Sequence, residues 1–266
     1  MTTLTRRSLV FVAMMATALI SGCVSTGVTP EVRQALAPTG ELRVGVYPGS
    51  PTSMIRDPAT GEVKGVSIDL GKELAARLEV PFKIVQFERV AQVVEALRMG
   101  VVDFTVTNAT EARAKDMDFS APILAIEQGH MVVSGSPVST LAEVDRPGVR
   151  VGVTQGSSSQ SVLSSQFQHA TLVTAPSLAA AVELLSSRKV DAYATNKSVL
   201  FELSDQLPGS RVLDGRWGLE RMALAIPKGR DNGLAYIRKF AEEARSAGLV
   251  KQAADKAGVR GTANTE

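Results

Sequence analysis

The sequence predicts an α/β protein built from two similar lobes. The first observation is that strand-like and helix-like segments alternate in two separate sets along the chain. The second is a long, mostly apolar segment, residues 123–133, which lies between the sets and is suited to bridging two lobes. Alternating strands and helices favour parallel sheets with right-handed crossovers, so each set predicts a small parallel sheet with helices packed on it.

The first set begins where apolar residues alternate with period two up to the turn signal Pro48-Gly49, which indicates a strand. Apolar residues at helical spacing then predict an amphipathic helix, and the pattern repeats until Gly100 ends a second helix. The predicted order of strand, helix, strand, helix and strand falls at residues 42–46, 68–78, 82–87, 91–99 and 103–107.

The second set repeats this order, and its first helix opens in a serine-rich turn. The predicted segments are residues 149–153, 158–167, 171–173, 178–187 and 191–194. A further strand at 222–226 and two helices, at 234–247 and 249–257, complete the body. In open α/β sheets, ligands bind beyond the carboxyl ends of the strands, so a cleft between the lobes is the expected site.

Composition excludes several function classes. The chain has 266 residues, 44% of them hydrophobic and 21% charged, which is enough for a core that needs no disulfides or structural metal. A formal charge of +2 is too small to indicate a basic surface that binds nucleic acid. Aromatic residues, at 5%, are too few for a base-stacking platform. One Cys and two distant His argue against a metal site, so we expect no metal, no cofactor and no nucleic-acid partner.

The N-terminus has the features of an export signal. Arg6 and Arg7 precede the apolar run 9–20, which is too short to span a bilayer of about 30 Å but suits a secretory signal. The run ends in a sequence that resembles a lipobox, Ile20-Ser21-Gly22-Cys23, so we expect residues 1–22 to be removed and Cys23 to be lipidated. The alternative is a signal peptide with an incidental Cys.

The paired arginines fit either a twin-arginine or a general secretory signal. They also account for the net charge, because Arg6 and Arg7 are the only ionisable side chains before Cys23 and the remaining body balances 27 basic against 27 acidic residues. Residues 23–39 are expected to be the lipidated Cys and a tether. The protein is therefore expected at the cell surface or in the periplasm, held to a membrane by its lipid.

Several short motifs occur together in a characteristic order. They are the strand at 42–46, GVSIDL at 65–70, GVVDF at 100–104, TEAR at 110–113, DFSAP at 118–122, VGVTQGSS at 151–158 and VDA at 190–192. On these motifs the chain resembles the family 3 extracellular solute-binding proteins, the polar-amino-acid binders of ABC importers, over residues 40 to 258. The resemblance implies the bilobal periplasmic-binding-protein fold of type II, with a two-strand hinge and the ligand cleft between its lobes.

The lobes then divide the chain into residues 40–126 with 226–260, and residues 127–225. The resemblance implies a monomer that captures a small solute and delivers it to an ABC permease and its ATPase subunit. An amino acid or another small carboxylate is the leading candidate. Two alternatives use the same fold: a periplasmic dehydratase-like enzyme, for which Glu127 is the obvious acid–base candidate, and a ligand-sensing lipoprotein. We expect no catalysis.

Arg113 is the first residue that the resemblance places in the cleft. Similar proteins use this arginine to bind the ligand carboxylate through a bidentate, charge-assisted pair. The competing structural role is an ion pair with Glu111, Asp116 or Asp118.

Thr107 and Asn108 end the third predicted strand, and similarity implies that they contact the ligand; turn formation is the alternative role for Asn108. The turn at Gly156, Ser157 and Ser158 opens a helix, where free N–H groups favour an anion, although plain N-capping uses the same geometry.

Three features depart from the family pattern. The stretch between Asp103 and Arg113 is shorter, and the usual position of an aromatic platform falls near Ser50, so Tyr47 could supply the ring or pack in the core. Asn196 stands where amino-acid binders carry an aspartate for the ligand ammonium. Either another acid, such as Glu88 or Glu127, replaces that aspartate, or the ligand is not a standard zwitterion.

Overall fold

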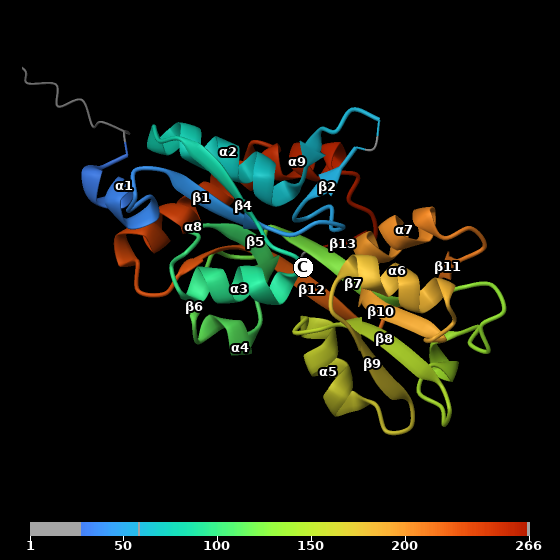
Figure 1. Ribbon diagram of the computed structural model, residues 1–266. Helices are drawn as coiled ribbons and strands as arrows, with labels where there is room; N and C mark the ends of the chain where they lie inside the picture. The colour runs from blue at the N-terminus through green and yellow to red at the C-terminus, as the bar shows by residue number, and fades with distance from the viewer. Residues whose placement is uncertain (1–27, 58, 265–266) are drawn as a thin grey trace, which may run out of the picture.

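The computed structural model describes residues 28–57 and 59–264, and it shows two α/β lobes joined by long strands (Figure 1). The predicted signal segment and Cys23 lie outside these residues. Within the described part of the chain, no helix has both the length and the apolarity needed to cross a membrane.

The first lobe contains a parallel sheet with β1 in its middle. Its elements are β1 (Leu42–Val46), α2 (Val66–Leu78), β4 (Phe82–Gln86), α3 (Val90–Arg98) and β5 (Thr105–Asn108). β1 pairs in parallel with β4 and bridges in parallel to Phe104 at the start of β5. α2 packs on this sheet because Leu70, Leu74 and Leu78 form one apolar face, and all three are buried. The predicted order of strands and helices for residues 42–107 is confirmed.

The second lobe repeats this arrangement. Its elements are β8 (Arg150–Thr154), α5 (Ser158–Gln166), β9 (Thr171–Ala175), α6 (Leu178–Ser186) and β10 (Ala192–Asn196). β8 pairs in parallel with β9 on one side and with β10 on the other. The sequence did not predict α7 (Lys197–Gln206), which follows β10 directly and begins at an Asn196 cap. A short 3₁₀ helix (Leu141–Glu143) and β11 (Arg211–Val212) complete the lobe.

Two antiparallel strands connect the lobes. β7 (Leu124–Val132) pairs with β10 in the second lobe, and β12 (Gly218–Pro227) pairs with β5 in the first. The two strands also pair with each other, so the sheet is continuous between the lobes. The predicted lobe boundaries stay a prediction, but residues 222–225 of β12, which that division gives to the second lobe, pair with β5 of the first lobe. Met222, Leu224 and Ile226 pack in the core of the first lobe.

The hydrophobic core is divided between the lobes. One cluster joins α2, β1 and the C-terminal helices α8 (Asp231–Ser246) and α9 (Leu249–Lys256). Two further clusters, centred on Tyr193 and on Val151, fill the second lobe. The remaining short elements lie at the edges of the first lobe and the hinge. They are β2 (Ile55–Arg56), β3 (Val63–Lys64), α4 (Glu111–Ala114), β6 (Met117–Phe119) and β13 (Thr262–Ala263).

The predicted tether at 23–39 is wrong for its second half. Residues Pro30–Leu36 form helix α1, which starts at a Thr29 cap with Pro30 in its first turn. Leu36 is fully buried, and Gly233 of α8 lacks the side chain that would collide with it. Arg33 also donates to the Leu78 carbonyl oxygen at 2.7 Å. This segment is therefore part of the first lobe.

Candidate functional site

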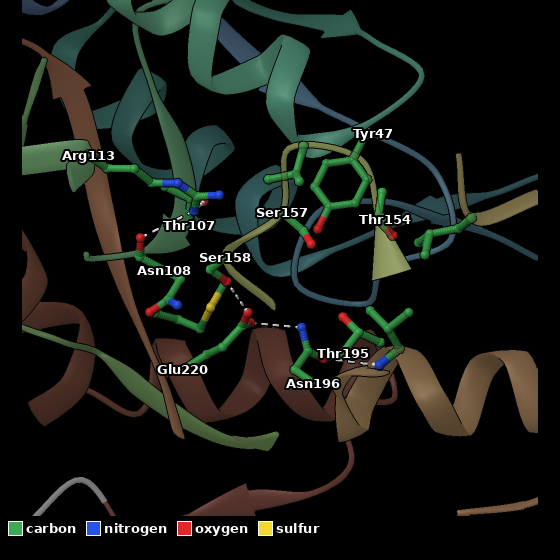
Figure 2. Close-up of a pocket in the computed structure, with 14 residues that line it drawn as sticks. Tyr47, Thr107, Asn108, Arg113, Thr154, Ser157, Ser158, Thr195, Asn196 and Glu220 are labelled. Carbon is green, nitrogen blue, oxygen red and sulfur yellow. Dashed lines mark hydrogen bonds between the residues drawn. The ribbon is translucent and has the colours of Figure 1, made fainter. Parts of the chain in front are cut away.

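A cavity lies where the two lobes and the hinge meet. It opens at the carboxyl ends of β1, β5, β8 and β10, which is the expected place for a ligand in α/β sheets. Most of the residues that line it are polar, and they come from both lobes and the hinge. They are Tyr47, Thr107, Asn108, Arg113, Thr154, Ser157, Ser158, Thr195, Asn196 and Glu220, all labelled in Figure 2.

Arg113 reaches the cavity from α4, a single helical turn that is capped by Thr110. Its Nη1 donates to the Thr107 hydroxyl at 2.7 Å and to the Asn108 carbonyl oxygen at 3.2 Å. Burial lowers the pKa of the guanidinium, and the negative charge of Glu220 acts in the opposite direction. Within the described chain, no carboxylate lies within ion-pairing distance of Arg113.

The alternative structural role predicted for Arg113 is therefore wrong. Neither Glu111 nor Asp116 pairs with Arg113 in the described chain, and Asp118 pairs with Lys228 at 2.9 Å instead. Thr107 and Asn108 lie at the cavity as predicted, and the structure gives them a second task, because they fix the direction of the guanidinium. The Asn108 side-chain oxygen also accepts from the Arg221 N–H at 3.0 Å, so this amide ties β5 to β12.

The turn between β8 and α5 is a capped helix start. The Ser157 hydroxyl accepts from the Gln160 N–H at 3.1 Å, so the predicted N-capping role is confirmed. The Gly156 N–H donates to the Gln160 side chain at 2.6 Å, and Gly156 is not among the cavity-lining residues. Its backbone faces Ala91 of the other lobe so closely that a Cβ on Gly156 would lie 2.6 Å from the Ala91 Cβ. The structure therefore gives Gly156 a role in the contact between lobes rather than on the cavity wall.

Tyr47 and Ser50 both lie in the loop after β1, but only Tyr47 of the two lines the cavity. Tyr47 lines the cavity and packs against the hydrophobic cluster of the second lobe, and burial raises the pKa of its phenol to about 12. Ser50 is fully buried behind it, and its hydroxyl pairs with Thr52 at 3.0 Å. The structure thus brings Tyr47 to the cavity and does not bring Ser50 to its wall.

Asn196 lies at the cavity, but its two amide atoms are already engaged. Its Oδ1 accepts from the Val199 N–H at 3.1 Å at the start of α7, and its Nδ2 donates to Glu220 at 2.8 Å. Ser158 donates to the other oxygen of Glu220 at 2.8 Å. Figure 2 shows the Glu220 carboxylate between these two side chains.

Glu220 is the site residue that the sequence interpretation missed. Neither predicted replacement for the aspartate lies in the cavity: Glu88 is 77% exposed, and Glu127 pairs with Lys197 at 2.7 Å and with Arg216 at 3.3 Å. A signal was present, because alternation along β12 puts Glu220 on the same inward face as Met222, while Arg221 between them is exposed. The predicted strand begins at residue 222, whereas β12 begins at Gly218 and includes Glu220.

Metal binding has no support in the described residues. In residues 28–57 and 59–264, no cluster of three or more His, Cys, Asp and Glu side chains could hold a metal ion. The cavity wall carries the partly buried cation Arg113, the buried carboxylate Glu220 and several hydroxyl and amide groups. Such a set can bind a small polar solute without a metal or cofactor.

Comparison with known proteins identifies relatives of this chain. The ABC transporter glutamine-binding protein GlnH of Bacillus subtilis (strain 168) is 24% identical over 84% of this chain and 86% of its own length. An ancestral arginine-binding protein bound to glutamine is 28% identical, with a TM-score of 0.72 over 82% of this chain and 97% of that chain.

A third relative is the ancestral amino acid-binding protein AncCDT-1, a precursor of cyclohexadienyl dehydratase. It superposes with a TM-score of 0.73 at 24% identity, over 84% of this chain and 98% of that one. These likenesses confirm the predicted bilobal type II fold. The family model of the bacterial extracellular solute-binding proteins, family 3, matches residues 42–258. The chain belongs to this family.

Proposed function

We propose that this protein captures an amino acid or a closely related small carboxylate outside the cytoplasm and presents it to an ABC permease and its ATPase. The observation that carries the proposal is Arg113, a partly buried guanidinium that faces the cavity and is held there by Thr107 and the Asn108 carbonyl. Arginine pairs with carboxylates through two parallel hydrogen bonds, and such pairs are stronger when water is excluded. The names of the relatives, which bind glutamine or arginine, support the same solute class.

A thermal-shift screen of the purified protein against the twenty L-amino acids, simple amines and small carboxylates tests this function. A ligand at 100 times its Kd adds about 2.7 kcal/mol, which is a shift of several degrees for a protein of this size. Arg113→Ala should abolish the shift, whereas Arg98→Ala, which removes an exposed arginine paired only with Glu95, should not. A flat response to every amino acid and carboxylate, or an undiminished shift with Arg113→Ala, would overturn the proposal.

We also propose that the protein binds without catalysis. Glu127, the predicted acid–base candidate, is engaged by Lys197 and Arg216 and is not part of the cavity wall. The test is to incubate the best-bound amino acid with an equal amount of protein and to analyse it by mass spectrometry. Full recovery of unchanged amino acid is expected, and a stoichiometric product would contradict this part of the proposal.

The proposed location depends on the N-terminus. We propose that residues 1–22 are removed and that a lipid on Cys23 holds a monomer at the membrane. Cys23→Ser should move the protein from the membrane fraction to the soluble extract, as measured by immunoblot of both fractions. An unchanged membrane fraction would show that Cys23 is not the anchor.

A further inference from the structure

Glu220 is a buried carboxylate that forms no ion pair with the described residues. It is 6% exposed, and its two oxygens accept hydrogen bonds from Ser158 and from Asn196, each at 2.8 Å. Both donors are neutral groups. No Lys, Arg or His of the described residues lies within ion-pairing distance of Glu220, since Lys197, the residue after Asn196, pairs with Glu127 instead.

A charge in this position is costly unless something compensates it. Taking a carboxylate out of water costs several kcal/mol, and neutral hydrogen bonds return only part of that. Asp103 shows the usual solution in this protein, because it is fully buried and pairs with both Arg43 and Arg230. Glu220 has no such pair, and it differs from Asp103 in facing the cavity.

The wall of the cavity therefore carries two charges of opposite sign, the partly buried Arg113 and the buried Glu220, and neither forms an ion pair with another residue of the described protein. Arg113 comes from the first lobe. Glu220 comes from β12, and groups of the second lobe hold its carboxylate. A solute with a carboxylate and an ammonium group would satisfy both charges at once. Such a solute would also link the two lobes, because its two ends would be bound from opposite sides.

We propose that Glu220 binds the ammonium group of the solute and that it makes the site select amino acids over deaminated carboxylates. This assignment rests on the proposed function and names its solute class as zwitterions. Similar proteins carry an aspartate at the position of Asn196. In this protein the corresponding negative charge is that of Glu220 on the hinge strand β12. Asn196 is then a positioning residue, since one amide atom caps α7 and the other holds Glu220.

The test compares an amino acid with the same molecule lacking its amine. The probes are the L-amino acid with the largest thermal shift and its 2-hydroxy acid, titrated calorimetrically into the protein and into Glu220→Gln. The unchanged protein should prefer the amino acid at least a hundredfold, because breaking a buried ion pair is strongly unfavourable. Glu220→Gln, which keeps the shape but not the charge, should reduce this preference to less than tenfold.

Two further variants separate charge from structure. Glu220→Gln combined with Asn196→Asp returns a carboxylate 2.8 Å from the original one and should recover at least tenfold of the lost preference. Glu183→Gln, an exposed position on α6, is the matched control and should leave both affinities unchanged. Ligand-free thermal unfolding of Glu220→Gln should match or exceed that of the unchanged protein, since the variant removes an uncompensated buried charge.

Equal losses of affinity for the amino acid and the hydroxy acid in Glu220→Gln would overturn this assignment, and so would an unchanged preference. Either result leaves the proposed function standing if Arg113→Ala still abolishes binding. If the unchanged protein binds no amino acid, or if Arg113→Ala binds normally, the proposed function fails, and the assignment of Glu220 fails with it.

Discussion

The two lobes share a framework down to individual hydrogen bonds. In the first lobe, Arg43 at the start of β1 binds Asp103 with Nε at 2.7 Å and Nη2 at 2.8 Å, and its backbone N–H donates to the same carboxylate. In the second, Arg150 at the start of β8 binds Asp191 in the same three ways, at 3.0, 2.8 and 2.8 Å. Each pair ties the first residues of the central strand to the start of a neighbouring strand.

The lobes differ at the opposite ends of the same strands, where the cavity lies. The first lobe presents a cation, Arg113, fixed by the end of β5. The polar groups that the second lobe presents are hydroxyls and amides, and two of them, from Ser158 and Asn196, hold the carboxylate of Glu220 from the hinge. The repeated framework therefore sets the position of the cavity, and residues outside the repeat set its charges.

The largest expected difference between the lobes follows from replacing the aspartate in each of the two Arg–Asp pairs. Asp103 is fully buried and holds Arg43 and Arg230, so Asp103→Asn should cost about 3–5 kcal/mol. Asp191 holds only Arg150, whose side chain is 43% exposed, so Asp191→Asn should cost only about 1–2 kcal/mol after solvent screening. Urea unfolding of both variants measures the difference. Equal costs would show that the second arginine in the first lobe adds nothing.

The second prediction concerns the loss of folding stability at low pH, which we expect to arise in the second lobe. His130 on β7 is 2% exposed, and its ring lies 6.3 Å from that of Phe167 and 6.1 Å from that of Trp217. Neither of its ring nitrogens has a hydrogen-bond partner in the described structure. Burial lowers its pKa from 6.5 to about 4.

The folded protein therefore binds this proton only below about pH 4, whereas the unfolded chain binds it below about pH 6.5. Stability should fall between these values as the pH decreases, by about 3 kcal/mol from this group. His130→Phe should remove that part of the loss, which unfolding free energies at pH 7, 5.5 and 4 would show. Parallel pH profiles for the variant and the unchanged protein would contradict the assignment.

The smallest expected effect tests the contact between the lobes. Gly156 has φ +71° and lies against Ala91, so Gly156→Ala combines backbone strain with a collision across the lobes. Gly148 has φ +84°, and no atom lies within 4 Å of the place that a Cβ would take, so Gly148→Ala causes the strain alone. Affinity for the best-bound amino acid should fall roughly tenfold in Gly156→Ala, equivalent to about 1.4 kcal/mol, and stay unchanged in Gly148→Ala. Equal affinities for the two variants would show that the contact does not influence binding.

Sequence patterns predicted the framework well because local spacing determines it. Alternation in β1 and the four-residue spacing of Leu70, Leu74 and Leu78 are visible in any single segment. Helix α1 was missed because its small and polar residues resemble a linker, although Thr29 and Pro30 carried a start signal. Its burial depends on Gly233, which lies far along the chain.

The cavity was predicted only in part, for a related reason. Arg113, Thr107 and Asn108 lie in one short stretch whose motif is readable, and the structure brings them together. Glu220 depends on side chains from α5 and β10, so no local pattern shows that it meets Asn196 and Ser158. Ser50 and Gly156 illustrate the reverse case, because both were predicted to bind the ligand but neither lines the cavity: Ser50 pairs with Thr52, and Gly156 lies against Ala91.

The most direct test of the whole account is a crystal structure of the protein with its best-bound L-amino acid. We expect the solute in the cavity of Figure 2, with its carboxylate on Arg113 and its ammonium nitrogen at hydrogen-bond distance, about 2.7–3.2 Å, from a Glu220 oxygen. A solute bound elsewhere, or bound here with its ammonium group away from Glu220 and its carboxylate away from Arg113, would contradict it.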